Sequence, residues 1–343
     1  MNLKLSQAIE GFTLAKQVAG CSHYTIRNYH LDLRRFSASL DGDPHLRDIT
    51  SDHVRTHLHQ LQTTRLESPG VAPRPARIPS PKTVRNAHTT LSSLWTWAVE
   101  EGYVDVHVVR AVQPPRASHH EIKPLSQADV KAVLDAIALS QPWHSRPGTR
   151  NSRPSWICRR DRAIILLLLD TGMRAGELCS LTRPDVDLRQ GTAQVRGKSR
   201  LNAGQGKQRI VYFGTRTRKA LWQYLQGDQG DHPGPNREAG AGKGSPLQAG
   251  HLFLTTTGGP IDRRHLATHL RRLGKRAGVQ PCNPHRFRHT FSIRYIKNRG
   301  DPFTLQKLLG HSSLDMVKRY LAIAQVDCEN GHRCAGPVDN WGL

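Results

Sequence analysis

The segment QPPRASHHEIKP, residues 113–124, divides the chain into two parts and thereby limits the folds open to it. Two adjacent prolines and the lack of an apolar repeat exclude a core helix or strand here, so we interpret the segment as a linker. A chain of 343 residues is long enough for two domains, each with its own hydrophobic core. We therefore expect a first domain at 1–115, a linker at 116–125, a second domain at 126–325 and a tail at 326–343.

The first part carries the apolar spacing of amphipathic helices. One face of a helix is marked by residues at alternating intervals of three and four: Ile26, Tyr29, Leu33, Phe36 and Leu40. Such a helix would begin after the capping residue Ser22 and stop before Gly42. Similar segments begin near Leu5, near Thr50 and at Ser80, and a Pro-rich stretch before Ser80 is predicted to be a loop. These segments predict a small helical bundle.

The second part mixes helices with a few short strands. Ser126 and Asp129 resemble a helix capping box, and DRAIILLLLDTG is apolar on all sides, which predicts a buried helix. A loop is expected at roughly 141–156. GTAQVRGKSR and KQRIVYFG alternate like paired strands around a basic turn, and the helical pattern returns after Ile261. We expect a mainly α fold of the α+β class with one small antiparallel sheet.

The charge of the chain indicates its partner. The net charge is +23, of which residues 1–115 carry +3 and the remainder +20. Such an uneven excess favours a polyanionic partner, with nucleic acid ahead of a membrane because no strongly amphipathic anchor is visible. The alternative is a basic surface that serves only solubility.

Other features exclude several protein classes. The longest apolar run, residues 163–169, is far shorter than the about 20 residues of a membrane-spanning helix. The N-terminus has no apolar core of signal-peptide length. Six cysteines form no Cys-x-x-Cys pair, which favours reduced thiols without a disulfide. We therefore expect a cytoplasmic protein with no membrane partner.

Four stretches of the second part contain residues that can act together on an anion. They are TGMRAGEL, VRGKSR, HRFR and LLGHSSLDMVKRY, and they contain in this order Arg174, Lys198, His285, Arg288, His311 and Tyr320. Each residue alone has an ordinary structural explanation, such as a half-buried core tyrosine, a helix-cap histidine or an arginine paired with a neighbouring acid. For Lys198, the nearby Arg196, Arg200 or Lys207 could serve instead.

The order and spacing of these residues resemble the tyrosine recombinase (phage integrase) family, most closely its Xer-like members. The gaps of 24 residues from Arg174 to Lys198 and 23 from Arg288 to His311 agree with the family pattern. The resemblance covers nearly the whole chain, and the helical bundle resembles the family's SAM-like core-binding domain. It implies site-specific cutting and rejoining of DNA through a 3′-phosphotyrosine intermediate, for integration, excision or resolution of a DNA element.

The chemistry of phosphodiester cleavage accounts for the two arginines and the lysine. The transition state carries extra negative charge on the phosphate oxygens, and two guanidinium groups can hold these oxygens bidentately. By family position these are Arg174 and Arg288. The leaving 5′ oxygen needs a proton, and the resemblance assigns its delivery to Lys198.

The remaining residues serve the nucleophile. Tyr320 has an ordinary pKa near ~10, so its hydroxyl is protonated at neutral pH and needs help to attack. We expect His285 to accept that proton and His311 to hydrogen-bond the phosphate or Tyr320. Glu177, one helical turn after Arg174, matches an acidic position of the family and is expected to fix neighbouring side chains. This scheme requires no metal and no cofactor.

A further basic stretch, DRRHLATHLRRLGKRAG, is expected to bind DNA. Its basic residues surround one helix, which the family lays against DNA: Arg263, Arg264, Arg271, Arg272, Lys275 and Arg276. A merely solvated helix face is the alternative. In the tail, Cys328, His332 and Cys334 lack the ligand spacing of a zinc site.

The resemblance also implies partners. It predicts a clamp of two domains around double-stranded DNA, and a homo-tetramer on two duplexes, with possible accessory DNA-bending or directionality factors. The tail at 326–343 would dock on a neighbouring protomer. Two alternatives remain at this point: a type IB topoisomerase-like enzyme that nicks and rejoins DNA as a monomer, and a catalytically idle DNA-binding protein on the same fold.

Overall fold

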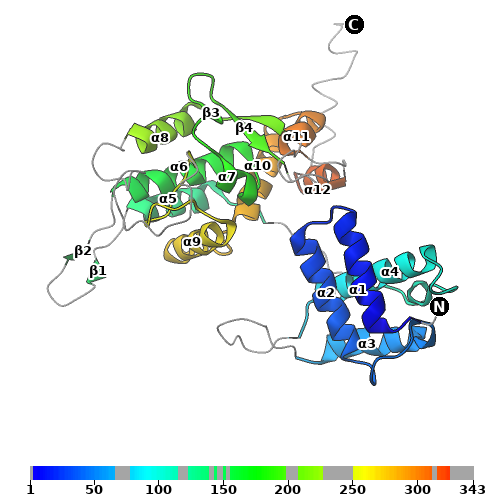
Figure 1. Ribbon diagram of the computed structural model, residues 1–343. Coiled ribbons are helices and arrows are strands. Elements are labelled where there is room, and N and C mark those ends of the chain that lie inside the picture. Colours follow the sequence, from blue (N-terminus) through cyan, green and yellow to red (C-terminus); the bar gives the residue numbers. More distant parts are fainter. Residues whose placement is uncertain are drawn as a thin grey trace, which may run out of the picture. The chain divides into compact units, whose positions relative to one another are not determined.

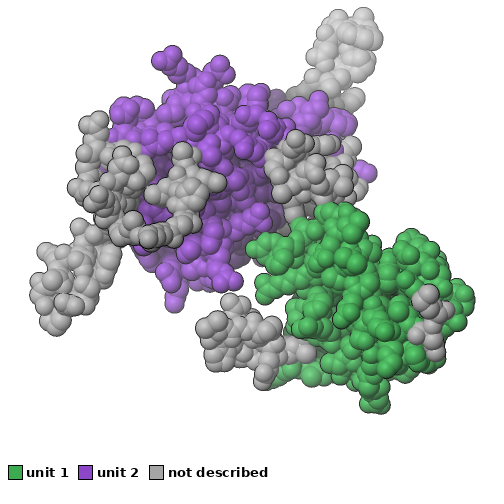
Figure 2. All heavy atoms as spheres, in the orientation of Figure 1, with its two compact units in different colours: residues 1–120, 199–204 green, residues 121–198, 205–343 purple. Residues whose placement is uncertain are grey.

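In the computed structural model the chain folds into two compact units (Figures 1 and 2). The first unit comprises residues 1–120 and 199–204, and the second comprises residues 121–198 and 205–343. The structure describes residues 3–65, 78–114, 123–138, 143–144, 150–151, 155–197, 208–226, 250–310 and 315–324.

The first unit is the predicted helical bundle. Its helices are α1 (Leu5–Val18), α2 (His23–Ser37), α3 (Ser51–Thr63) and α4 (Pro81–Glu100), with short 3-10 helices at Leu46–Asp48 and Val108–Ala111. The predicted caps are confirmed for α2 and α4, because the Ser22 and Ser80 hydroxyls accept hydrogen bonds from the backbone amides of Thr25 and Thr83. A proline at the first position of α4 costs no helical hydrogen bond.

Aromatic side chains fill the centre of this bundle. Phe12, Phe36 and Trp95 are fully buried, and the rings of Phe36 and Trp95 meet edge to face with centroids 6.0 Å apart. Apolar side chains of α3 and α4 are buried as well, among them Val54 and Leu91. This core lies entirely within the first unit, so the bundle has its own hydrophobic stabilisation.

The second unit is mostly helical with a small sheet. Its first helices are α5 (Gln127–Ala138), α6 (Ser155–Thr171), α7 (Ala175–Ser180) and α8 (Thr215–Gln226). The last four are α9 (Arg263–Arg276), α10 (Pro284–Lys297), α11 (Pro302–Leu309) and α12 (Asp315–Ala324). Ser126 and Asp129 form the expected reciprocal cap of α5.

The sheet has three antiparallel strands in the order β3 (Val186–Asp187), β4 (Thr192–Arg196) and β5 (Gln208–Tyr212). The predicted pair is confirmed as β4 and β5, in a register that places Ala193 opposite Val211. The loop predicted at 141–156 is wrong in part, because Trp143–His144 (β1) pairs with Arg150–Asn151 (β2) and α6 begins at Ser155. Two-residue strands leave no alternation for a sequence pattern to detect.

Helix α6 is the centre of the second core. Ile164, Ile165, Leu167 and Leu168 are at most 1 % exposed, as an all-round apolar helix requires. The helix packs against α5, α8 and α10 (Figure 1). Helix α10 carries part of the candidate site, so this packing gives that site a rigid support.

The end of the predicted linker belongs to the second unit. Residues 123–125 pack on α10: Leu125 is buried, and its amide donates to the Thr290 hydroxyl at 2.7 Å. The Arg286 guanidinium donates to the carbonyls of Lys123 and Pro124. Burial of the apolar Leu125 side chain stabilises the fold, which explains why this residue packs on α10 and is not part of an exposed linker. Residues 115–122 lie outside the described residues.

Candidate functional site

The structure brings Arg174, Glu177, Arg288 and Tyr320 together from three helices of the second unit. Arg174 is the N-cap of α7 and Glu177 lies in its first turn, while Arg288 and Tyr320 belong to α10 and α12. Helix α12 packs on α10 and on α11. Lys198 and His311 lie outside the described residues, so their roles stay predictions.

The arginines of the site are anchored on the C-terminal end of α11. Gly310 follows this helix with φ 62°, the left-handed conformation that ends a helix. The carbonyls of residues 308–310 then accept from three guanidinium groups: Arg209 at 2.7 Å, Arg288 at 2.8 Å, and Arg174 at 3.3 and 3.2 Å. Carbonyls at a helix C-terminus carry partial negative charge, so this end is a suitable seat for cations. The sequence Leu-Leu-Gly therefore positions the arginines.

Glu177 is the carboxylate that orders two of these arginines. It is 4 % exposed, and Arg209 donates to its two oxygens at 2.9 and 2.8 Å. Arg174 adds a side-chain bond of 3.1 Å and a backbone bond of 2.7 Å. Burial by itself would raise the pKa of Glu177, but the hydrogen bonds and charges of Arg209 and Arg174 lower it below its ordinary value. Glu177 is therefore ionised at neutral pH.

Arg288 and Arg174 differ in their exposure. Arg288 is 4 % exposed and donates to the Gly172 carbonyl at 2.8 Å, whereas the Arg174 side chain is 43 % exposed. Burial lowers the pKa of Arg288 to about 10, and the charge of Arg174 adds to this shift, while Glu177 and Tyr320 oppose it. Arg288 remains a cation at neutral pH, so the site has one buried and one accessible guanidinium group.

Gly172 is required beside Arg288 for two reasons. Its φ of 60° lies in the left-handed region, and a Cβ there would lie 2.4 Å from the Phe291 ring. Gly172, directly after α6, therefore lets the chain turn sharply and places its own carbonyl next to Arg288.

Tyr320 is buried and contacts a histidine of α10. The side chain is 1 % exposed and belongs to an apolar cluster with Ile293, Ile296, Leu305, Leu309 and Val317. Its hydroxyl lies 2.9 Å from Nδ1 of His289. His285, the expected proton acceptor, is an exposed residue one turn earlier, and its ring centroid lies 6.4 Å from that of His289.

Sequence reasoning did not identify Arg209 and His289 as site residues. Arg209 had only an alternating strand pattern around it, which says nothing of a partner 32 residues earlier. His289 directly follows Arg288, and its position four residues after His285 was a usable signal, because residues at that spacing share a helix face.

Helix α9 presents the expected basic surface. All six of its singled-out residues, Arg263, Arg264, Arg271, Arg272, Lys275 and Arg276, are exposed, while Leu266, Leu270 and Leu273 face the core. The Arg263 guanidinium lies over Gly176 of α7, where an added Cβ would be 2.6 Å from it. The N-terminal end of α9 is therefore adjacent to the helix that carries Arg174 and Glu177.

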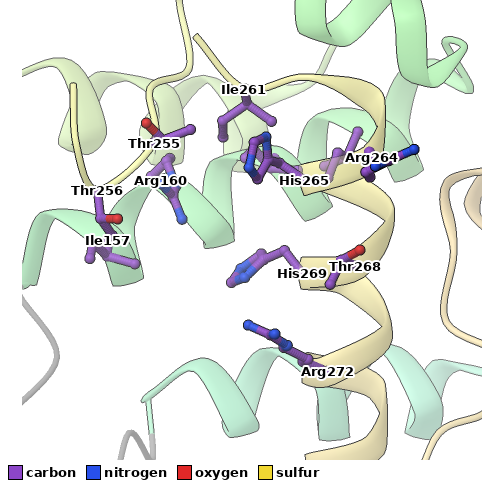
Figure 3. Close-up of a pocket in the computed structure, with 12 residues that line it drawn as sticks. Ile157, Arg160, Thr255, Thr256, Ile261, Arg264, His265, Thr268, His269 and Arg272 are labelled. Carbon is purple, nitrogen blue, oxygen red and sulfur yellow. The ribbon is translucent and has the colours of Figure 1, made fainter. Parts of the chain in front are cut away.

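A cavity of about 430 Å³ lies between α9 and α6. Figure 3 shows His269 and Arg272 of α9 and Arg160 of α6 pointing toward the same space. The buried carboxylate of Asp161 accepts from Arg160 at 2.8 Å and lies 2.8 Å from Nε2 of His269. The contact between His269 and Asp161 joins α9 to α6, while the six basic residues of α9 remain exposed.

The described residues contain neither a metal-binding cluster nor a membrane-spanning helix. They contain no group of three or more His, Cys, Asp or Glu side chains arranged to hold a metal ion. None of the helices described here has the length and apolar character needed to cross a membrane. Cys328, His332 and Cys334 lie outside the described part of the chain.

Comparison with known proteins matches both units. The model of the phage integrase family matches residues 151–326, and that of the phage integrase N-terminal SAM-like domain matches residues 9–105. Tyrosine recombinase XerD of Corynebacterium glutamicum is 30 % identical over 321 residues, which cover 93 % of each chain. Tyrosine recombinase XerC of Oceanobacillus iheyensis is 27 % identical, covering 93 % of this chain and 92 % of the relative.

Solved structures share the fold. The Tn1549 transposon integrase in complex with a circular intermediate DNA superposes with a TM-score of 0.67 at 18 % identity, covering 93 % of this chain and 95 % of that one. A lambda integrase tetramer bound to a Holliday junction gives a TM-score of 0.63 at 18 % identity, with 91 % and 79 % covered.

Proposed function

The chain belongs to the phage integrase family as a tyrosine recombinase of the Xer type, an enzyme of site-specific recombination that cuts and rejoins DNA, and we propose how its residues perform this reaction. Tyr320 is the nucleophile, and Arg174 and Arg288 hold the scissile phosphate. The observation that supports this proposal is the anchoring of Arg174 and Arg288 on one helix end, with Tyr320 close enough to influence the pKa of Arg288.

The two guanidinium groups would stabilise the transition state. The accessible Arg174 reaches solvent and can meet a phosphate oxygen first, while the buried Arg288 forms a rigid wall. Both are held before DNA arrives, so little reorganisation is needed as negative charge develops on the oxygens. Glu177 accepts two hydrogen bonds from the Arg209 guanidinium group. It thereby keeps this third cation from binding the phosphate in place of Arg174 or Arg288.

In the cleavage step one bond to phosphorus forms while another breaks. The Tyr320 oxygen attacks phosphorus and its proton passes to a base, while the bond from phosphorus to the 5′ oxygen breaks and Lys198 supplies the proton to that oxygen. The tyrosine then carries the 3′ phosphate, and attack by a 5′ hydroxyl reverses each step. The family resemblance implies His285 as that base, and His311 would hydrogen-bond the phosphate or Tyr320. No metal is required for these steps.

The Tyr320 hydroxyl must be uncovered before it can react. A side chain that is 1 % exposed cannot meet a phosphate, so we propose that DNA binding uncovers this hydroxyl while its contact with His289 on α10 is kept. The covered state would keep an unbound protomer from cutting DNA.

DNA would be bound by both units, with the six basic residues of α9 on the phosphate backbone or in a groove. By analogy with the lambda integrase tetramer on a Holliday junction, four protomers would join two duplexes. Docking of the tail at 326–343 on a neighbouring protomer, and accessory factors, are part of the same proposal. A cross-linked tetramer on DNA would separate this enzyme from a monomeric type IB topoisomerase-like one.

The test uses a pool of nicked duplexes with randomised centres, because a nick lets the cut fragment diffuse away and traps the covalent complex. The parent protein should form a phosphotyrosyl adduct whose DNA, once sequenced, reveals the preferred site. Tyr320→Phe should bind the selected duplex and form no adduct, whereas Tyr295→Phe, a tyrosine of α10, should form it at the parental rate. An adduct from Tyr320→Phe would overturn the assignment.

A further inference from the structure

The Tyr320 hydroxyl lies near two groups of α10 that can govern its reactivity. His289 approaches it with Nδ1 at 2.9 Å, and the ring centroids of the two residues are 5.7 Å apart. Arg288 is near enough for the Tyr320 phenol to influence the Arg288 pKa. His289 and Arg288 are consecutive residues, so the helix fixes their mutual position.

From this geometry we propose that His289 is the base that accepts the phenolic proton of Tyr320. The inference rests on the proposed role of Tyr320 as the nucleophile. As the phenolic oxygen bonds to phosphorus, its O–H bond breaks and the proton passes to the lone pair of Nδ1, which makes His289 an imidazolium. On rejoining, the oxygen leaves phosphorus and takes the same proton back, so no co-reactant is consumed.

Geometry favours His289 over His285 for this role. A general base must lie within hydrogen-bond reach of the proton that it removes, and His289 meets this condition. His285 is one turn away and exposed, so a group that comes from solvent can reach it. We therefore assign proton transfer to the half-buried His289 and phosphate contact to the exposed His285.

The charges around His289 are consistent with a transfer that DNA triggers. Titratable or charged groups near His289 include His285 and Arg288 on its own helix and Tyr320 on α12. Without DNA the Arg288 cation opposes a second positive charge on His289. A phosphate between Arg174 and Arg288 adds a negative charge, which makes an imidazolium at His289 less costly.

The tautomer of His289 provides a test that needs no DNA. If Nδ1 accepts the Tyr320 proton, then Nε2 must carry the hydrogen of the neutral ring. Nitrogen NMR of the full chain labelled with ¹⁵N-histidine, assigned with His289→Asn, should show a protonated Nε2 and an unprotonated Nδ1 at a pH where the ring is neutral. A hydrogen on Nδ1 would overturn the proposal, since His289 would then be the donor.

The kinetic test compares two matched substitutions on one helix. The Asn side chain in His289→Asn places an acceptor oxygen near the former Nδ1 and cannot take up a proton near neutral pH. Single-turnover adduct formation with the selected duplex should fall by a factor on the order of 10²–10⁴ at neutral pH. Compared with the parent at the same pH, so that partial loss of the Arg288 charge affects both proteins alike, the deficit should shrink as the pH approaches ~10, where the phenol ionises by itself.

His285→Asn should also react slowly, but its deficit should persist at high pH because a phosphate contact is missing. If alkaline recovery occurs in His285→Asn and not in His289→Asn, the assignment of the base is wrong. If His289→Asn matches the parent at every pH, this inference fails and the proposed function stands. If the parent forms no adduct with any duplex of the pool, the proposed function itself fails.

Discussion

Glu177→Gln is the substitution that most directly tests how the arginines are held. The change keeps the size of the side chain and one acceptor oxygen, but removes the negative charge shared by Arg209 and Arg174. Glu177 is 4 % exposed and the Arg209 side chain 13 % exposed, so water cannot replace the lost partner. The half-exposed Arg174 can turn to solvent, which leaves Arg209 as the main source of the loss.

The expected magnitude follows from this burial. Removing one partner of a buried ion pair lowers the free energy of unfolding by about 3–5 kcal/mol. In a unit of this size each kcal/mol lowers the melting temperature by about 2–4 °C, so the second unit should melt roughly 6–20 °C earlier. Adduct formation should fall as well, because Arg174 would lose the carboxylate that positions its guanidinium group.

The chain contains a matched control in Asp52→Asn. Arg55 and Asp52 form an ion pair with the same three-residue separation as Arg174 and Glu177, but their side chains are 52 % and 82 % exposed. An exposed pair contributes about 0–1 kcal/mol, so this change should barely alter the transition of the first unit. Scanning calorimetry of both variants gives the comparison, with the unaltered unit as an internal reference.

The pH dependence provides a second check with a defined sign. The folded-state pKa of Glu177 is lowered, so its contribution to stability is fully present above the unfolded pKa near ~4.3 and is lost as the pH falls through the folded value. The difference between the parent and Glu177→Gln should therefore shrink below pH ~4. Equal small losses for Glu177→Gln and Asp52→Asn at neutral pH would refute the anchoring argument.

Gly310→Ala places a side chain at a left-handed φ of 62°, so the second unit should lose about 1–2 kcal/mol and cleave more slowly; an unchanged melting temperature would contradict this. DNA affinity should fall steeply with salt, by about 0.9 logarithmic units per phosphate neutralised and decade of salt, and Arg271→Gln should reduce the slope by about one unit; a flat response would exclude backbone contacts. Lys198→Ala should cut slowly and recover when sulfur replaces the leaving 5′ oxygen, and no recovery would place Lys198 outside leaving-group protonation. EDTA should leave cleavage unchanged, whereas a loss restored by magnesium would indicate a metal nuclease.

The sequence by itself determined the helices, the two-part organisation and the family. Apolar spacing and caps such as Ser22 and Ser80 depend on residues a few positions apart, so a local pattern is sufficient to detect them. The ordered set from Arg174 to Tyr320 could be recognised because it keeps fixed residue types at fixed gaps. For the same reason the fold class was predicted correctly, while the two-residue strands β1 and β2 were missed.

Only the tertiary structure decided which side chains meet. Arg209 and Glu177 are 32 residues apart, and nothing in either local stretch indicates the other. The burial of Tyr320 and its contact with His289 depend on how α12 packs against α10. Such contacts arise when separate elements close on a common core, and burial then sets the strength and pKa of each charged group. Sequence spacing indicated the chemistry, and packing determined which of these side chains are in contact.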